Sequence, residues 1–296
     1  MQATRISIVR AISIPIASRK PGGFRDIILP LARHTNAEGT NAYALSVAKE
    51  FGASVSGLAL AIEPVIPASG PFDAVPGAVI EDLIARAIAE AQECSAAFLR
   101  QAKDHAPKVS AKTVRASFHE SEEYFAEAAR SFDLAVVPQN KPDEQSVPNF
   151  AEAALFHSGR PVLAVPYIQR TLLSLNRVLV CWDGSRAAAR AVSDAWPLLE
   201  RAKAVSVITI GHGQWPAKLQ QDFKKHLSTH GIDASMDVLT ADDIDAGNAI
   251  LSHAADIQAD LLVMGGYGHS RLREWVLGGV TRTILQTMTL PTLLSH

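Results

Sequence analysis

The chain has 296 residues, of which 48% are hydrophobic and 20% charged, and its formal net charge is −2. This length allows one large or two ordinary domains, and the composition is that of a globular protein. Lys and Arg are scattered, so no basic surface for nucleic acid or anionic lipid is indicated. No apolar run reaches the roughly 18 residues that a membrane helix needs. We therefore expect neither nucleic acid nor a membrane as a partner.

The N-terminal residues 1–23 have an apolar middle that Arg5, Arg10 and Pro15 interrupt. We interpret this segment as an extension rather than a signal peptide. The two cysteines, Cys94 and Cys181, belong to no metal or redox motif, which fits a reducing compartment. The sequence therefore predicts a cytoplasmic protein.

From residue 26 onwards, short apolar runs alternate with helical patterns. In the first half, strands are expected at 26–31, 54–60, 109–116, 134–138 and 161–165, with helices at 41–51, 78–105, 121–131 and 149–157. In the second half, strands are expected at 177–182, 204–210, 234–239, 261–264 and 291–294, with helices at 186–201, 215–230, 247–258 and from about 279.

The two halves run through the same series of elements. Residues 132–137 match 259–264, and residues 160–163 match 290–293. Strands that alternate with helices form a parallel sheet with right-handed crossovers. The sequence therefore predicts two tandem α/β domains, at residues 24–166 and 176–296.

The clearest functional signal lies between Asp260 and Thr289. A buried strand ends at Gly265-Gly266-Tyr267-Gly268, and Gly278-Gly279 precede a helix. Glycines let the backbone turn tightly and approach a ligand, and the free N–H groups of a helix start suit an anion such as phosphate. The alternative is that these glycines only end a strand and begin a helix.

The pattern Gly265-x-x-Gly268, nine residues, then Gly278 resembles the phosphate and ribose loop of the universal stress protein family. The family motif ends in Ser or Thr, where this chain has Gly279. As a helix cap, Gly is only roughly a few tenths of a kcal/mol worse than Ser. The fold should therefore tolerate the change, whereas a hydroxyl that would touch a phosphate is lost.

The resemblance extends over nearly all of the chain after residue 24. It implies doubly wound, five-stranded parallel sheets of the adenine nucleotide alpha-hydrolase-like type, with strand order 3-2-1-4-5. It also implies that a bound ATP contacts Gly265, Gly268 and Gly278, and that an acidic residue matching Asp183 helps to hold the adenosine.

Ligands of doubly wound sheets bind beyond the carboxyl ends of the strands, where the strand order reverses. In the second half, this point lies between the first and fourth strands, whose ends carry Asp183 and Gly265. Asp183 could also be a turn residue or a cap in Asp-Gly-Ser, and the two roles are compatible. The expected nucleotide-binding residues are Asp183, Ile210, Gly265, Gly268, Gly278, Gly279, Val280 and Thr281.

The first half lacks these features. Its first strand ends at Leu31-Ala32-Arg33-His34 without an Asp, and its fourth ends at Pro138-Gln139-Asn140-Lys141 without glycines. We expect this half to bind no nucleotide and instead to pair with the second half, as subunits pair in single-domain relatives.

Two further clusters invite a metal interpretation, and neither supports one from sequence alone. Asp242, Asp243 and Asp245 precede a helix, where acidic residues favour the helix dipole. His226 and His230 share one helical face, but the sequence positions no further zinc ligand. The sequence also lacks a P-loop, H-E-x-x-H, C-x-x-C and G-x-S-x-G. We therefore expect no metal site and no catalytic residue.

Together these observations and the resemblance predict a tandem universal stress protein that binds an adenine nucleotide and acts in stress regulation. ATP is the first candidate for the nucleotide, and Mg²⁺ is an optional companion ion. Its two domains would pair within the chain, with a homodimer as a further option. The alternatives are a slow adenine-nucleotide hydrolase and a scaffold that binds no nucleotide.

Overall fold

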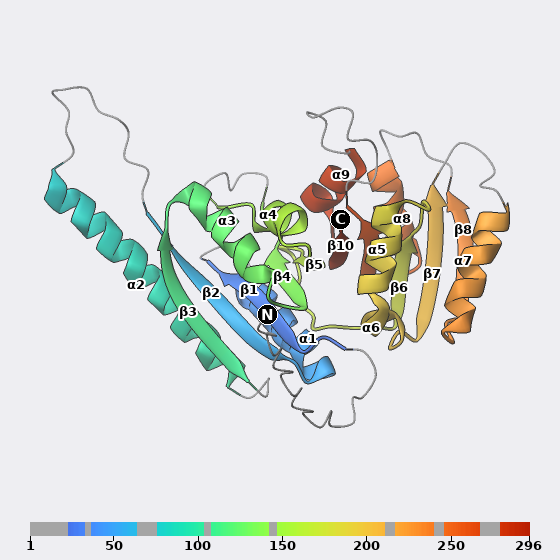
Figure 1. Cartoon of the computed structure of the whole chain (residues 1–296), viewed down its shortest axis with the longest axis horizontal. Helices are drawn as coiled ribbons and strands as arrows, with labels where there is room; N and C mark the ends of the chain where they lie inside the picture. The colour runs from blue at the N-terminus through green and yellow to red at the C-terminus, as the bar shows by residue number, and fades with distance from the viewer. Residues whose placement is uncertain are drawn as a thin grey trace, which may run out of the picture.

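The computed structural model (Figure 1) shows a twisted sheet with helices on both faces. It describes residues 23–32, 37–63, 76–103, 108–141, 147–210, 217–239, 246–266 and 279–296.

The elements of the first half are β1 (Asp26–Leu31), α1 (Ala37–Phe51), β2 (Ser54–Ile62), α2 (Gly77–Ala102), β3 (Val109–Ala116), α3 (Phe118–Ala129), β4 (Leu134–Pro138), α4 (Phe150–His157) and β5 (Val162–Val165). Those of the second half are β6 (Arg177–Cys181), α5 (Arg186–Asp194), α6 (Trp196–Leu199), β7 (Ala204–Ile210), α7 (Ala217–Thr229), β8 (Ala234–Leu239), α8 (Ala246–Asp256), β9 (Leu261–Gly265), α9 (Gly279–Thr287) and β10 (Thr292–Ser295).

The described strands form one ten-stranded sheet in the order β3-β2-β1-β4-β5-β10-β9-β6-β7-β8. Within each half, the strands are parallel and follow the order 3-2-1-4-5, which confirms the predicted fold class. The halves join where β5 and β10 pair antiparallel, with Leu163 opposite Leu293. The predicted pairing of the two halves within one chain is therefore confirmed, and it makes their parallel strands run in opposite directions.

Two layers of helices cover the sheet. One core lies beneath α1, α2, α5, α6 and α7, and includes Tyr43, Phe98, Leu198 and Leu227. The other lies beneath α3, α4, α8 and α9, and includes Phe125, Phe150, Ile250 and Ile284. Each core takes residues from both halves, so the chain buries apolar area across the junction as well as within each half.

Most elements begin and end within a few residues of the predicted limits, and the differences have local causes. The helix expected at 186–201 is two helices, because Pro197 cannot donate to the preceding turn and its ring disfavours a continuous helix. The helix expected from residue 121 begins at Phe118 instead. There, Ser117 and Glu120 form a reciprocal capping box that satisfies two N–H groups of the first turn.

Within the described part of the chain, no helix combines the length and apolarity that crossing a bilayer would require.

Candidate functional site

The predicted site residues Asp183 and Gly265 lie at the ends of neighbouring strands. β6 pairs with β9 so that Val180 lies opposite Val263. Continuing this register by two residues brings Trp182 level with Gly265, and Asp183 follows Trp182. The order of the sheet reverses between these two strands, which is where ligands of doubly wound sheets bind.

Asp183 forms the turn that starts α5. Its Oδ1 accepts a hydrogen bond from the Ser185 N–H at 2.9 Å, and Ser185 Oγ accepts one from Ala188 N–H at 3.1 Å as the N-cap of α5. The turn interpretation of Asp183 is therefore correct. The side chain remains exposed at the carboxyl edge of the sheet, so a ligand can also reach it.

Cys181, two residues before Asp183, is partly buried and packs against the core beneath α3, α4, α8 and α9. Burial, and then the negative charge of Asp183, raise the pKa of its thiol. The thiol therefore stays protonated at neutral pH, because both effects disfavour the thiolate.

Two of the glycines have packing reasons to be glycine. A Cβ on Gly265 would lie 2.6 Å from the backbone carbon of Ala187 and from the nitrogen of Ala188, so the start of α5 lies directly against β9. A Cβ on Gly266 would lie 2.8 Å from a methyl carbon of Leu155 in the first half. Neither glycine is evidence of a ligand by itself, since close packing already excludes a side chain at both positions.

Gly279 differs from them. It is exposed at the start of α9, and a Cβ there would meet no atom within 4 Å. The first turn of α9 carries no acidic residue, so nothing there offsets the positive end of the helix dipole. Because α9 follows β9 and returns along the sheet, its N-terminus lies at the same carboxyl edge as Asp183.

The other predicted site residues take different places. Val280 is half-buried and packs on the core beneath α8 and α9, whereas Thr281 is 4% exposed. Ile210 ends β7, on the far side of β6 from β9, opposite Leu239. Gly268 and Gly278 lie outside the described residues.

The corresponding edge of the first half is filled by its own side chains. Pro138 and Gln139 occupy the positions that match Gly265 and Gly266, and both Gln139 and Gly266 donate their N–H to the neighbouring strand at 2.8 Å. The buried amide of Gln139 accepts from Tyr167 N–H at 3.2 Å and donates to the Leu285 carbonyl of α9 at 3.0 Å. This edge thus holds the two halves together.

The helix that follows is also closed to an anion. Asn149 caps α4 by accepting the Glu152 N–H at 3.3 Å, and Glu152 places a carboxylate in the first turn. A phosphate at this helix start would therefore meet the negative charge of Glu152. The Glu152 N–H is also already bonded to Asn149 and is not available to a ligand.

One feature of the second-half edge escaped the sequence analysis. The Nδ1 atom of His296 donates to the Gly266 carbonyl at 3.0 Å, and its ring packs edge-on against Phe156 of α4, with centroids 5.4 Å apart. No motif marks His296 or Phe156, because their contact depends on the antiparallel joint between β5 and β10.

The fold is that of a doubly wound α/β protein, and its second half carries Asp183 and the end of β9 at one strand-end edge. Residues 174–296 match the model of the universal stress protein family.

The chain is similar to "Universal stress protein Slr1230" of Synechocystis, at 28% identity over 138 residues, which cover 45% of this chain and 46% of the relative. The match thus spans about half of that relative's length.

Solved structures share the fold over both halves. A universal stress protein from Archaeoglobus fulgidus matches with a TM-score of 0.70 and 16% identity, over 91% of this chain and 95% of that one. A functionally unknown protein from Pseudomonas aeruginosa matches with a TM-score of 0.57 and 17% identity, over 92% of each chain.

Proposed function

We propose that the second half binds one adenine nucleotide at the edge formed by Asp183, the end of β9 and the start of α9. ATP is the first candidate among the adenine nucleotides. The observation that carries the proposal is the open N-terminus of α9, which has an exposed Gly279 and no acidic residue in its first turn. The N–H groups of its first turn and the positive end of its dipole suit a phosphate, and the exposed Asp183 supplies an acceptor for a ribose hydroxyl or an adenine amino group.

The first half would supply support and bind no nucleotide. Its fourth strand ends in Pro138 and Gln139, and Gln139 is committed to Tyr167 and Leu285. This contrast favours one nucleotide per chain over two. The proposed domains are residues 24–166 and 176–296, with residues 1–23 as an extension.

The cellular role we propose is regulatory, in the stress response. ATP would act by binding one arrangement of the chain more tightly than another, since a ligand shifts an equilibrium only through such a difference. Leu155, Phe156 and Gln139 reach from the first half to the edge of the second, so they offer a route by which an occupied site could alter the junction.

A thermal shift experiment with ATP, AMP and no ligand tests the proposal. ATP should raise the melting temperature of the full chain, because a ligand that binds only the folded state stabilises it. In Gly279→Glu, the new carboxylate would repel the phosphates as Glu152 does in the first half, and the shift should largely disappear.

Gly279→Gln is the matched control, since it adds a side chain of the same size without the charge. It should keep most of the shift. An ATP shift that is equal in wild type and Gly279→Glu would reject the site, and no shift in wild type would favour the scaffold alternative. Steady ATP turnover that is lost in Asp183→Ala would favour the hydrolase.

A further inference from the structure

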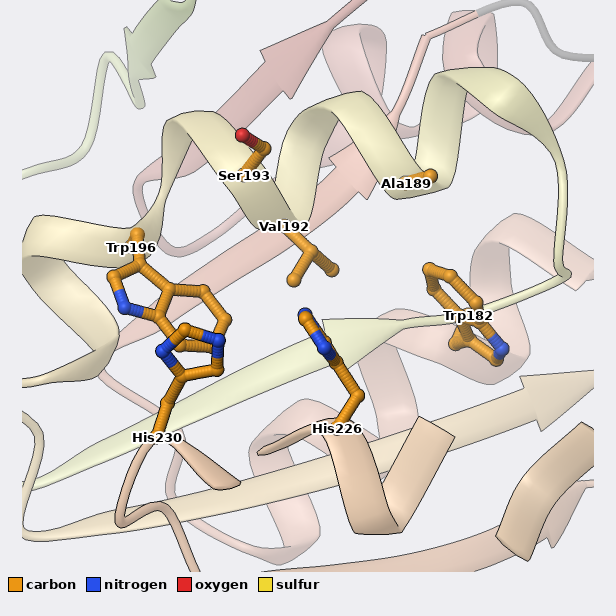
Figure 2. Close-up of a pocket in the computed structure, with 7 residues that line it drawn as sticks. All are labelled: Trp182, Ala189, Val192, Ser193, Trp196, His226 and His230. Carbon is orange, nitrogen blue, oxygen red and sulfur yellow. The ribbon is translucent and has the colours of Figure 1, made fainter. Parts of the chain in front are cut away.

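A second candidate site lies on the helical face of the C-terminal half. A cavity of about 330 Å³ opens between α5–α6 and α7. It is lined by Trp182, Ala189, Val192, Ser193, Trp196, His226 and His230 (Figure 2). Neither histidine belongs to the proposed nucleotide edge.

The two histidines stand at the mouth of this cavity. His226 lies in the last turn of α7, and His230 follows the last residue of that helix, Thr229. Phe223 and Leu227 of the same helix are buried, whereas both histidines are exposed. Figure 2 shows the two imidazoles projecting from α7 toward α5 and α6. The rings therefore face a common space that solvent reaches.

The separation of the rings suits a shared metal ion. The centroids of His226 and His230 are 5.0 Å apart, with 70° between the ring planes. A metal–imidazole bond of about 2.0–2.1 Å, with about 1.1 Å from the nitrogen to the ring centre, places two rings on one ion roughly 4.5–5.2 Å apart for angles from about 90° to 109°. The observed separation of the ring centroids falls inside this interval.

Neighbouring groups hold one ring in place. Trp196 packs edge-on against His230, with centroids 4.3 Å apart and 71° between the planes, and lies 5.7 Å from His226. Trp196 owes its place to the break between α5 and α6. A ligand ring that is already packed loses less rotational freedom on binding, which favours the chelate.

We propose that His226 and His230 chelate one divalent transition-metal ion of the copper, nickel and zinc class. Neutral imidazole is a preferred ligand for these ions, and copper binds tightest among them. Among the described residues, no group of three or more His, Cys, Asp and Glu side chains could hold a metal. Within the described part of the chain, water or a small ligand in the cavity would fill the other coordination positions, and such a site would release its metal readily.

The test is a titration of the full chain, without a histidine tag and after treatment with EDTA. Cu²⁺ or Ni²⁺ should quench the tryptophan fluorescence, because Trp196 touches a metal ligand. Calorimetry with Zn²⁺ should give one ion per chain. His226→Gln and His230→Gln should each weaken binding at least tenfold, and the double variant should abolish the saturable phase.

Two controls separate ligation from packing and from general surface binding. His230→Phe keeps an aromatic ring against Trp196 but removes the metal-binding nitrogens, so it should lose binding as His230→Gln does. His119→Gln, an exposed histidine of the first half, should bind as wild type does. Circular dichroism in EDTA confirms that each variant is folded.

Three outcomes overturn the proposal. They are no saturable quenching in wild type, unchanged binding in the double variant, and wild-type affinity in His230→Phe. In the first case, His230 serves only as an edge-to-face partner of Trp196, and His226 as a more distant, tilted neighbour.

Discussion

The two halves of the chain fold alike and differ most where their fourth strands end. Gly265 and Gly266 end β9, whereas Pro138 and Gln139 occupy the same positions at the end of β4. In the second half, the small residues let α5 and the neighbouring half approach the strand end. In the first half, a buried amide fills the equivalent space and reaches across the junction. The same edge of the fold thus holds a bridge between the halves in the first half, whereas in the second half it is the site proposed for the nucleotide.

The helices after these strands differ in the same sense. α4 starts with Asn149 as a cap and carries Glu152 in its first turn, whereas α9 starts at the exposed Gly279 with no acid. The electrostatic character of a strand-end site therefore depends on a few first-turn residues, which can change while the fold stays the same.

The largest effect is expected for Gly265→Val. A side chain at this position would collide with the backbone of Ala187 and Ala188, and overpacking of this kind costs about 1–3 kcal/mol. The free energy of unfolding, measured with urea, should fall by that amount or more. Gly279→Ala is the matched control and should leave stability nearly unchanged, because its Cβ points into open space. A stable Gly265→Val variant would show that α5 does not lie against β9.

The next effect concerns the joint between the halves. Gln139→Leu removes the buried amide that bonds Tyr167 and Leu285, and leaves a half-buried N–H and a half-buried carbonyl without this partner. We expect a loss of about 1–3 kcal/mol, visible as a lower melting temperature. Asn140→Ala is the control, since the Asn140 amide donates to the Val147 and Pro148 carbonyls, which belong to the first half. Melting curves of Gln139→Leu and Asn140→Ala that are the same, each with two separate transitions, would contradict this. They would show that the Gln139 bridge does not couple the unfolding of the two halves.

A smaller gain is expected when the family hydroxyl is restored. Gly279→Ser adds a side chain that can cap α9 and donate to a phosphate, worth about 0.5–1.5 kcal/mol for one hydrogen bond. ATP should therefore bind about two- to tenfold more tightly in a fluorescence competition assay. Unchanged affinity would mean that no phosphate reaches the start of α9.

The smallest effect concerns a pair of charges. Asp26 at the start of β1 lies beside Asp133, and the Asp133 N–H donates to Asp26 Oδ1 at 3.0 Å. In the second half, the matching pair is Arg177 and Asp260, which carry opposite charges. Desolvation by burial, together with the charge of Asp133, raises the pKa of Asp26 above its ordinary 3.8. Because the folded state binds this proton more tightly, the charged form destabilises the fold as the pH rises through that pKa.

Asp26→Asn should therefore melt slightly higher than wild type at pH 7, and the two should converge as the pH falls below 3.8. A series of melting curves from pH 3 to pH 8 measures this difference. If the melting temperature of Asp26→Asn exceeded that of wild type by the same amount at every pH, the charge of the Asp26 carboxylate would not be the cause.

Much of the fold could be predicted from the sequence, because apolar runs and the repeat locate the strands and the resemblance supplies their order. The β5–β10 joint could be expected only as pairing of the halves, since nothing local encodes an antiparallel register between Leu163 and Leu293. The break before Trp196 was readable from Pro197, and the capping box from Ser117 and Glu120.

The site was predictable only in part. The Asp-Gly-Ser turn and the end of β9 could be identified from local signals, but the packing reason for Gly265 depends on Ala187, which is distant in sequence. The pair His226 and His230 was visible as a helical spacing. What the sequence could not supply was the position of Trp196 or the distance between the rings, both of which come from tertiary packing.

The central claim is that one chain offers one nucleotide site, and calorimetric titration of the full chain with ATP tests it most directly. The account predicts saturable binding of one ATP per chain, weakened at least tenfold in Gly279→Glu and retained in Gly279→Gln. Binding of two equivalent ATP molecules per chain would contradict it. So would binding of one ATP with the same affinity in wild type and in Gly279→Glu.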